Sequence, residues 1–165
     1  MEAIRKNYGL LLDVGTRRPN PGWTSLALGG MVDHDPEFYP WPLDNESCLR
    51  ISLAYFIETI NPHKHGLVRL FNECWRVLKP SGQVAIVTIY PGSSASWQDP
   101  MIVRCYNQTT MCYFDFRHPL YQQYKPLPFT IMDRKIDWRV NGTLEVILQK
   151  HNDFTIASKD WGGQA

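Results

Sequence analysis

A chain of 165 residues has the length of one domain, and a domain of this size buries roughly 70% of the surface that its unfolded form exposes. Hydrophobic residues make up 44% of the sequence and charged residues 20%, which excludes an intrinsically disordered protein. Seventeen basic residues nearly balance sixteen acidic ones, so the formal charge of +1 gives no general attraction to nucleic acid.

The cysteines and the lack of long apolar stretches predict where the protein resides. Cys48, Cys74, Cys105 and Cys112 form no C-x-x-C pair and have no zinc-ligand spacing. We expect Cys48 and Cys74 to be reduced thiols in the core, which suits a reducing compartment. No stretch has the length of a transmembrane helix, and the first residues lack the apolar run of a signal peptide. We therefore expect a cytoplasmic protein with no membrane partner.

The chain begins with two predicted strands joined by a short turn. Tyr8–Val14 is a compact apolar run that stops at Gly15, and we expect it to be the first and central strand of a sheet. Pro19–Trp23 is turn material and leaves too few residues for a connecting helix. A second strand that ends at Ala27 therefore follows the turn directly.

The stretch from Pro40 to Ile89 predicts the fold class. Leu49–Leu53 suits a short buried strand, and His63–Leu78 places apolar residues three and four positions apart, as in an amphipathic helix. Lys79–Gly82 should end this helix, because Pro cannot continue it and Gly accepts a left-handed turn. Gln83–Ile89 is nearly continuous and β-branched, which is typical of a strand covered on both faces. A strand, a helix and a parallel strand in succession indicate an α/β sheet protein.

The rest of the chain predicts a loop, a short helix and a hairpin. Tyr90–Pro100 is a loop at the carboxyl end of a strand, where open α/β sheets bind their ligands. Asn107–Phe114 predicts a short helix whose first turn is capped by Asn107. Asn141-Gly142 accepts positive φ and predicts a hairpin between Phe129–Val140 and Thr143–Gln149. We expect residues 1–150 to form the domain and residues 151–165 to be a polar C-terminal tail.

Three segments resemble a known enzyme family. Asn72–Gly82 is similar to the E-x-x-R-V-L-K-P-G-G segment of class I S-adenosylmethionine-dependent methyltransferases. Pro40–Asp44 and Tyr55–Ile60 are similar to that family's P-W-P-F-x-D and H-V-L-E-H-I stretches. The likeness covers roughly residues 8 to 128, and its pattern is most similar to that of small phage and bacterial members. It implies a Rossmann-like three-layer sandwich with a mostly parallel twisted sheet and an antiparallel C-terminal hairpin.

The resemblance also implies where S-adenosylmethionine would bind if the chain is active. Asp13 and Gly15 would lie beside its methionine part, Asp35 would reach its adenine, and Tyr55 would also contact it. The family's site is altered at further positions, however, including two histidines of its pattern, whose places are taken by Thr59 and Ile102. Arg17 stands where the glycine loop needs a second glycine, so a long cation replaces a residue without a side chain. Ala27 stands where the family has the Asp that receives the ribose hydroxyls. The resemblance therefore implies a degenerate cofactor site.

The sequence contains no motif for a metal centre, a catalytic nucleophile or a phosphate-binding loop, and we assign no catalytic residue. His63-x-His65 could combine with His34 or His118, but no carboxylate or cysteine has ligand spacing around these imidazoles, so we expect no metal. No G-x-S-x-G nucleophile motif and no phosphate-binding glycine loop occurs. Glu58 matches the glutamate of H-V-L-E-H, and we interpret it as a carboxylate that starts a helix or lies in a loop.

Three functions remain open from the sequence. The first is a methyltransferase-like domain that has lost cofactor binding and catalysis and serves as a structural or binding module. Such a module would bind protein partners or self-assemble, for example in a phage particle or its assembly, and its cytoplasm would be that of the host. The second is an active methyltransferase with an atypical cofactor pose that uses Asp13, Asp35 and backbone groups. The third is a nucleic-acid-binding accessory that uses Arg17, Arg18 and Trp23.

Overall fold

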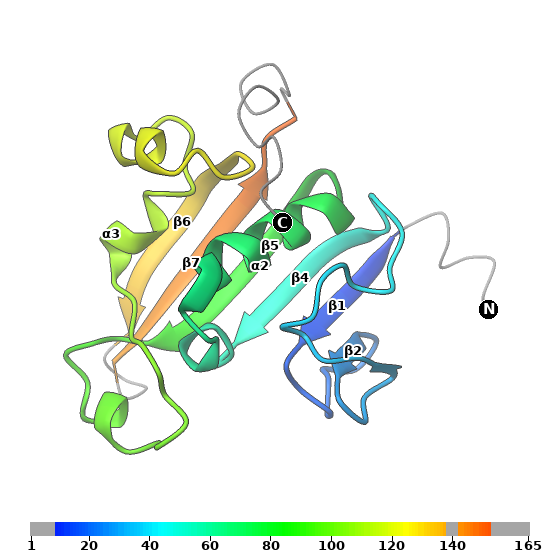
Figure 1. The fold of residues 1–165 in the computed structure, drawn as a ribbon, viewed down its shortest axis with the longest axis horizontal. Coiled ribbons are helices and arrows are strands. Elements are labelled where there is room, and N and C mark those ends of the chain that lie inside the picture. Colours follow the sequence, from blue (N-terminus) through cyan, green and yellow to red (C-terminus); the bar gives the residue numbers. More distant parts are fainter. Residues whose placement is uncertain (1–8, 138–141, 153–165) are drawn as a thin grey trace.

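The computed structural model describes residues 9–137 and 142–152, which are built around a seven-stranded sheet (Figure 1). The strand order is β3-β2-β1-β4-β5-β7-β6. The first five strands pair in parallel, and β7 is antiparallel to both β5 and β6. This confirms the predicted α/β class with a C-terminal antiparallel pair. The strands are β1 (Leu10–Val14), β2 (Thr24–Ala27), β3 (Val32–Asp33), β4 (Cys48–Ala54), β5 (Leu78–Ile89), β6 (Phe129–Asp137) and β7 (Thr143–Lys150).

Two details of the sheet differ from the sequence-based prediction. The first strand is an inner one, between β2 and β4, but the middle place of the seven belongs to β4. The sequence also gave no sign of β3, because its two residues are too few for an alternating pattern. β3 nevertheless pairs in parallel with β2 through Val32 and Asp33, and it forms one end of the sheet order.

The predicted amphipathic helix is confirmed as α2 (Gly66–Val77), and it starts three residues later than expected. The three residues before it form the single 3₁₀ turn η2 (His63–His65). Lys64 and His65 have φ values of 53° and 59°, a left-handed conformation that separates this turn from the helix. α2 buries Leu70, Phe71 and Cys74 completely against the sheet.

The predicted helix stop is wrong in its mechanism. The helix ends at Val77, and Leu78 is already extended with ψ of 136°, so β5 begins without an intervening turn. Ser81, not Gly82, has the left-handed conformation, with φ of 59°. Gly82 is needed for space instead, since a Cβ there would lie 2.9 Å from the Leu78 side chain and from the Lys79 carbonyl oxygen.

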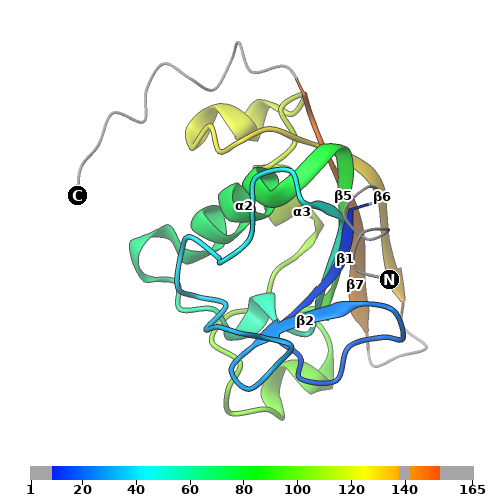
Figure 2. The same ribbon diagram turned by 90° about the vertical axis from the view of Figure 1, so that its right-hand side faces the viewer.

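Among the described residues, the helices lie on one face of the sheet. Figure 2 shows the sheet nearly edge-on, with α2, α3 (Gln108–Met111) and η4 (Pro119–Gln123) all on the same side. β5 alternates accordingly: Val84 and Ile86 are buried beneath the helices, whereas Ala85 and Val87 on the other face are half-buried. The expectation that this strand is covered on both faces is wrong for the described residues. There, the connections from β1 to β2 and from β2 to β3 contain no helix, so two of the three expected layers are present.

Two of the three segments that resemble the methyltransferase family, Pro40–Asp44 and Asn72–Gly82, are joined by hydrogen bonds that form a clamp between α2 and the turn before β4. The Glu73 carboxylate accepts hydrogen bonds from the backbone N–H of Trp41 at 2.6 Å and from Arg76 at 2.6 and 3.0 Å. Arg76 also donates to the carbonyl oxygens of Trp41 at 3.1 Å and Leu43 at 2.9 Å, and to the Asn45 side chain at 2.6 Å. The E-x-x-R spacing therefore has a structural role here: it fixes the proline-rich turn to the helix.

The C-terminal part of the chain follows the prediction closely. Asn107 caps α3, because its side chain accepts a hydrogen bond from the backbone N–H of Thr110 at 3.1 Å. The hairpin turn has Gly142 at φ of 67°, while Asn141 lies outside the described residues. No helix in the described ranges combines the length and the apolar character that a membrane crossing would need.

The two described ends of the main chain lie at the same turn. Gly9 is so close to Lys79 that a Cβ on it would lie 2.9 Å from that side chain, and Leu10 donates its N–H to the Ser47 carbonyl. The Asn152 side chain accepts a hydrogen bond from the Ser81 backbone N–H at 3.2 Å and donates one to the Ser81 hydroxyl at 3.3 Å. Most of the predicted tail, residues 153–165, lies outside the described residues.

Candidate functional site

The carboxyl ends of β1, β2, β4 and β5 meet at one edge of the sheet, which we call the carboxyl edge. Parallel α/β sheets bind their ligands at such an edge. The chain places all four residues that the resemblance assigned to the cofactor at or near this edge. Asp13 and Gly15 are at the end of β1, Tyr55 directly follows β4, and Asp35 follows β3.

Asp13 holds its own loop. Its carboxylate is 5% exposed and accepts hydrogen bonds from both the backbone N–H and the side-chain amide of Asn20, each at 3.4 Å. Gly15 begins this loop with φ of 82° and donates its N–H to the Leu26 carbonyl at 3.0 Å. The acidic group of β1 is thus engaged in shaping the turn between β1 and β2.

The aromatic ring of Phe56 packs directly on Gly15. A Cβ on Gly15 would overlap this ring, at 2.8 Å from its Cγ atom. Gly15 therefore does provide the close approach that the sequence predicted, but the group that approaches is a side chain of the same protein. Phe56 is the second residue after β4, so this contact joins the ends of β1 and β4.

Arg17 crosses from the β1 loop to the β2 loop. Its Nε donates a hydrogen bond to the Leu28 carbonyl oxygen at 2.8 Å. Leu28 directly follows Ala27, the position at which the family has its ribose-binding acid. Ala27 offers no polar side-chain atom, and it is 5% exposed. The two altered positions are therefore neighbours in space, and the arginine bridges the gap between the loops.

Asp35 and Tyr55 also make contacts of their own. The Asp35 carboxylate accepts the Glu37 N–H at 3.0 Å, and its carbonyl oxygen accepts the Phe38 N–H at 3.0 Å, so Asp35 forms a local turn. Tyr55 is 49% exposed and has a left-handed φ of 52°. Among the described residues, neither side chain forms a hydrogen bond with the Asp13 carboxylate.

Glu58, which the sequence predicted to start a helix or lie in a loop, is a buried acid. It belongs to the 3₁₀ turn η1 (Ile57–Thr59) and is 2% exposed. One carboxylate oxygen accepts the Thr88 hydroxyl at 2.8 Å, and the other, Oε1, has no hydrogen-bond partner among the described residues. Burial raises the pKa of this carboxyl. Sequence offered only the match to H-V-L-E-H as a signal, because nothing in the spacing predicts burial.

Glu58 also anchors the loop that follows β5. Its backbone carbonyl accepts the N–H groups of Val103 at 2.9 Å and Arg104 at 3.2 Å. This loop, residues 90–107, contains the 3₁₀ turn η3 (Ser94–Trp97) and covers the ends of β4 and β5. The buried acid and the loop above it thus form one structural unit at the carboxyl edge.

Large apolar side chains are exposed along the same edge. Trp97 is 87% exposed, Phe38 71% and Met101 68%. Most of the strongly exposed large apolar side chains in the described residues come from loops at this edge: Leu28, Met31, Phe38, Tyr55, Trp97, Met101 and Val103. Single exposed apolar residues are ordinary, but a set along one edge is typical of an interaction surface.

The histidines and cysteines do not form a metal centre in the part of the chain that the structure describes. No group of three or more His, Cys, Asp or Glu side chains there could hold a metal ion. His34 instead pairs with the Phe38 carbonyl oxygen at 2.8 Å. Cys48 and Cys74 are buried free thiols, as predicted.

Comparisons with known proteins place the fold. No family model matches the sequence, and no curated protein matches it. Solved structures do match, although the sequences of those compared are only 11–14% identical to this one. Each is similar over most of its length and has a TM-score above 0.5.

Three of these solved structures illustrate the range. A variant of the 16S rRNA (adenine(1408)-N(1))-methyltransferase from Catenulisporales acidiphilia has a TM-score of 0.57, 14% identity and coverage of 91% of this chain and 89% of that one. The second is the 1,6-didemethyltoxoflavin-N1-methyltransferase of Burkholderia thailandensis, with bound 1,6-didemethyltoxoflavin and S-adenosylhomocysteine. It has a TM-score of 0.60 and 14% identity, and the match covers 91% of this chain and 76% of that one. The third is a putative methyltransferase of Haloferax volcanii in complex with a methyltransferase activator. It has a TM-score of 0.56 and 13% identity, and the match covers 87% of this chain and 83% of that one. The chain therefore has the fold of class I S-adenosylmethionine-dependent methyltransferases.

Proposed function

We propose that this chain is a methyltransferase-like domain that does not bind S-adenosylmethionine and acts as a binding module. The observation that carries the proposal is the hydrogen bond from Arg17 to the Leu28 carbonyl oxygen, at 2.8 Å. It joins the β1 and β2 loops, at the position where the glycine loop of an active enzyme leaves room for the cofactor. An arginine side chain held across the two loops would occupy space that a glycine leaves open.

The other residues at the carboxyl edge do not fit the cofactor either. Ala27 has no acceptor for a ribose hydroxyl, and Asp35 already accepts a backbone N–H of its own turn. Phe56 fills the space in front of Gly15. Methyl transfer depends on holding the sulfonium carbon in line with the acceptor, so a loosely held cofactor would not react efficiently.

Calorimetry with S-adenosylmethionine and S-adenosylhomocysteine tests the first part of the proposal. We expect no binding heat from the full chain, whereas binding in the micromolar range would refute it. The variant Arg17→Gly removes the bridging side chain, and Arg18→Gly makes the same change at the neighbouring residue, whose side chain does not join the two loops. Binding that is gained by the first variant alone would identify Arg17 as the group that closes the site.

A protein partner is the second part of the proposal. It is supported by the exposed Trp97, Met101 and Phe38 at the carboxyl edge, since aromatic residues and Met are enriched in protein interfaces. Light scattering after size-exclusion chromatography should show self-association or a stable complex. Trp97→Ser should weaken that association, whereas Met132→Ser, on the outer strand β6 and 53% exposed, should leave it unchanged. The use in a phage particle or its assembly rests on the sequence resemblance alone.

An active methyltransferase with an atypical site is the second candidate, and Glu58 favours it. A buried carboxyl with a raised pKa and one unpaired oxygen, at the carboxyl edge, is the kind of group that serves in proton transfer. S-adenosylmethionine binding that survives Glu58→Gln, together with methyl transfer that is lost, would support this candidate over the first. Binding of nucleic acid through Arg17, Arg18 and Trp23, the third function left open by the sequence, would instead appear as salt-dependent retention.

A further inference from the structure

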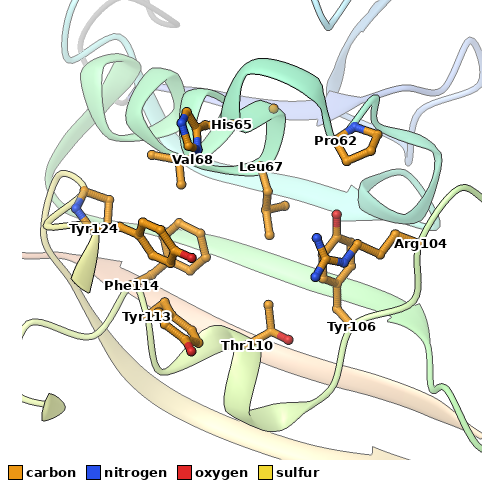
Figure 3. A pocket seen from close by; sticks show the side chains of 12 residues that line it. Pro62, His65, Leu67, Val68, Arg104, Tyr106, Thr110, Tyr113, Phe114 and Tyr124 are labelled. Carbon is orange, nitrogen blue, oxygen red and sulfur yellow. The ribbon is translucent and has the colours of Figure 1, made fainter. Parts of the chain in front are cut away.

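A cavity of about 250 Å³ lies between the first turn of α2 and the segment 104–126 (Figure 3). It shares no lining residue with Asp13, Gly15, Asp35 or Tyr55, so it is separate from the site that the resemblance implied. Its volume is just below the roughly 300–1,000 Å³ of ordinary small-molecule pockets. The cavity therefore has room for one ring system rather than for a dinucleotide-sized ligand.

The walls of the cavity are aromatic. Tyr113 and Tyr124 stand together at one end, with ring centroids 5.5 Å apart and planes inclined at 44°, and Phe114 lies beside them in Figure 3. Tyr106, which is 4% exposed, forms the other end. Aromatic rings pack best against a flat ring that lies face to edge or offset on them. The walls thus favour a planar aromatic ligand over a branched aliphatic one.

Among the described residues, the only permanently charged side chain that lines the cavity is a cation, Arg104. The Arg104 guanidinium lies 5.9 Å from the centroid of the Tyr106 ring, at the rim, and its side chain is exposed. Gly66, Leu67 and Val68 form the opposite wall and are the first residues of α2, a helix whose first turn contains no acidic residue and whose start has no side-chain cap. The positive end of the helix dipole therefore adds to the arginine charge. No Asp or Glu lines the cavity.

From the aromatic walls and the one-sided charge together, we propose that this cavity binds a small single-ring aromatic carboxylate. The ring lies between the Tyr106 and Tyr113 ends, and the carboxylate pairs with the Arg104 guanidinium. The inference stands apart from the proposed function, because it concerns other residues and would hold whether or not S-adenosylmethionine binds.

An amide NMR titration of the full chain with para-hydroxybenzoate tests the proposal. Two matched probes separate its parts: para-hydroxybenzamide keeps the ring without the charge, and cyclohexanecarboxylate keeps the charge without the aromatic ring. Arg104→Gln removes the rim cation while its backbone N–H can still donate to the Glu58 carbonyl. Arg50→Gln is the matched control, since Arg50 lies on β4 and donates to Gln83, away from the cavity.

The expected result is that para-hydroxybenzoate shifts the amide signals of the α2 first turn and of residues 104–114, more strongly than either matched probe. Arg104→Gln should weaken this binding about tenfold, as expected for the loss of one charge-assisted hydrogen bond, and Arg50→Gln should leave it unchanged. The proposal is overturned if para-hydroxybenzoate causes no shifts at millimolar concentration, if the shifts map elsewhere, or if the neutral amide binds equally well. Equal weakening by the two arginine variants would also overturn it.

Discussion

Removing the Glu73 carboxylate should destabilise the fold more than removing any exposed acid. In Glu73→Ala, the backbone N–H of Trp41 loses the only acceptor that the described residues give it, at 2.6 Å, and Arg76 loses its carboxylate partner. The Glu73 side chain is 8% exposed, so water cannot easily replace it around the Trp41 N–H. Arg76 is 27% exposed and keeps its bonds to the Leu43 carbonyl and Asn45, so its own loss is smaller.

The magnitude follows from these two terms. An unpaired buried N–H costs about 1–3 kcal/mol, and a partly exposed ion pair adds about 1 kcal/mol, so Glu73→Ala should lower the free energy of unfolding by roughly 2–4 kcal/mol. For a chain of 165 residues this corresponds to a fall in Tm of roughly 5–15 °C. Glu73→Gln, which keeps an acceptor for the Trp41 N–H, should lose about half as much.

Urea and thermal unfolding measure these changes, and Glu145→Ala is the control. Glu145 pairs with Lys135 at 2.9 Å, but the two side chains are 34% and 55% exposed, so its removal should cost less than about 1 kcal/mol. If Glu73→Ala and Glu145→Ala lower Tm equally, the clamp does not hold the proline-rich turn, and the reasoning from burial is refuted.

Three further outcomes are expected. Gly15→Ala should lower the free energy of unfolding by about 1–3 kcal/mol more than Gly22→Ala, because both glycines have φ near 83° but only Gly15 contacts the Phe56 ring. In a Phe56→Ala background this difference should disappear. If the difference persists there, the Phe56 contact is not its cause. The free energy of unfolding should fall as pH rises above about 4.5 and through the raised pKa of Glu58, because the folded state keeps that proton to a higher pH than the unfolded state does. Measured as Tm against pH, Glu58→Gln should lack this fall. If the two proteins lose Tm equally with rising pH, Glu58 is not the cause. Cys105 should react with a maleimide in the native protein before the other three thiols, which are buried, and a mass spectrum showing another site first would contradict the burial pattern.

The long periodic elements could be predicted from the sequence. The apolar spacing in α2, the β-branched run in β5 and the Gly142 turn each follow from local preferences, and the structure confirms all three elements. β3 could not be found, because two residues carry no periodicity. The left-handed Ser81 was also missed, since local preference assigned that conformation to Gly82, which is needed for space.

For the candidate site, the sequence predicted which residues stand at the cofactor positions but not the contacts that they make. The sequence showed that Arg17 and Ala27 depart from the family pattern, but not that Arg17 would reach the Leu28 carbonyl, because that contact depends on the path of two loops. Burial of Glu58 depends on the loop that starts after β5 and returns over it. Contacts between segments far apart in the chain therefore set the chemistry of this edge, and no local pattern encodes them.

The entry and exit of the described main chain have a consequence for how this domain could be used. Gly9 adjoins Lys79 and Asn152 adjoins Ser81, so both connections leave from a single small turn at the end of the sheet opposite Trp97. When the segments that enter and leave a domain lie side by side, as Gly9 and Asn152 do, the domain can be inserted into a loop of a host protein without distorting that loop. In such an insertion the carboxyl edge, with the exposed Trp97, would face away from the host protein. A partner could then bind at that edge without contacting the host.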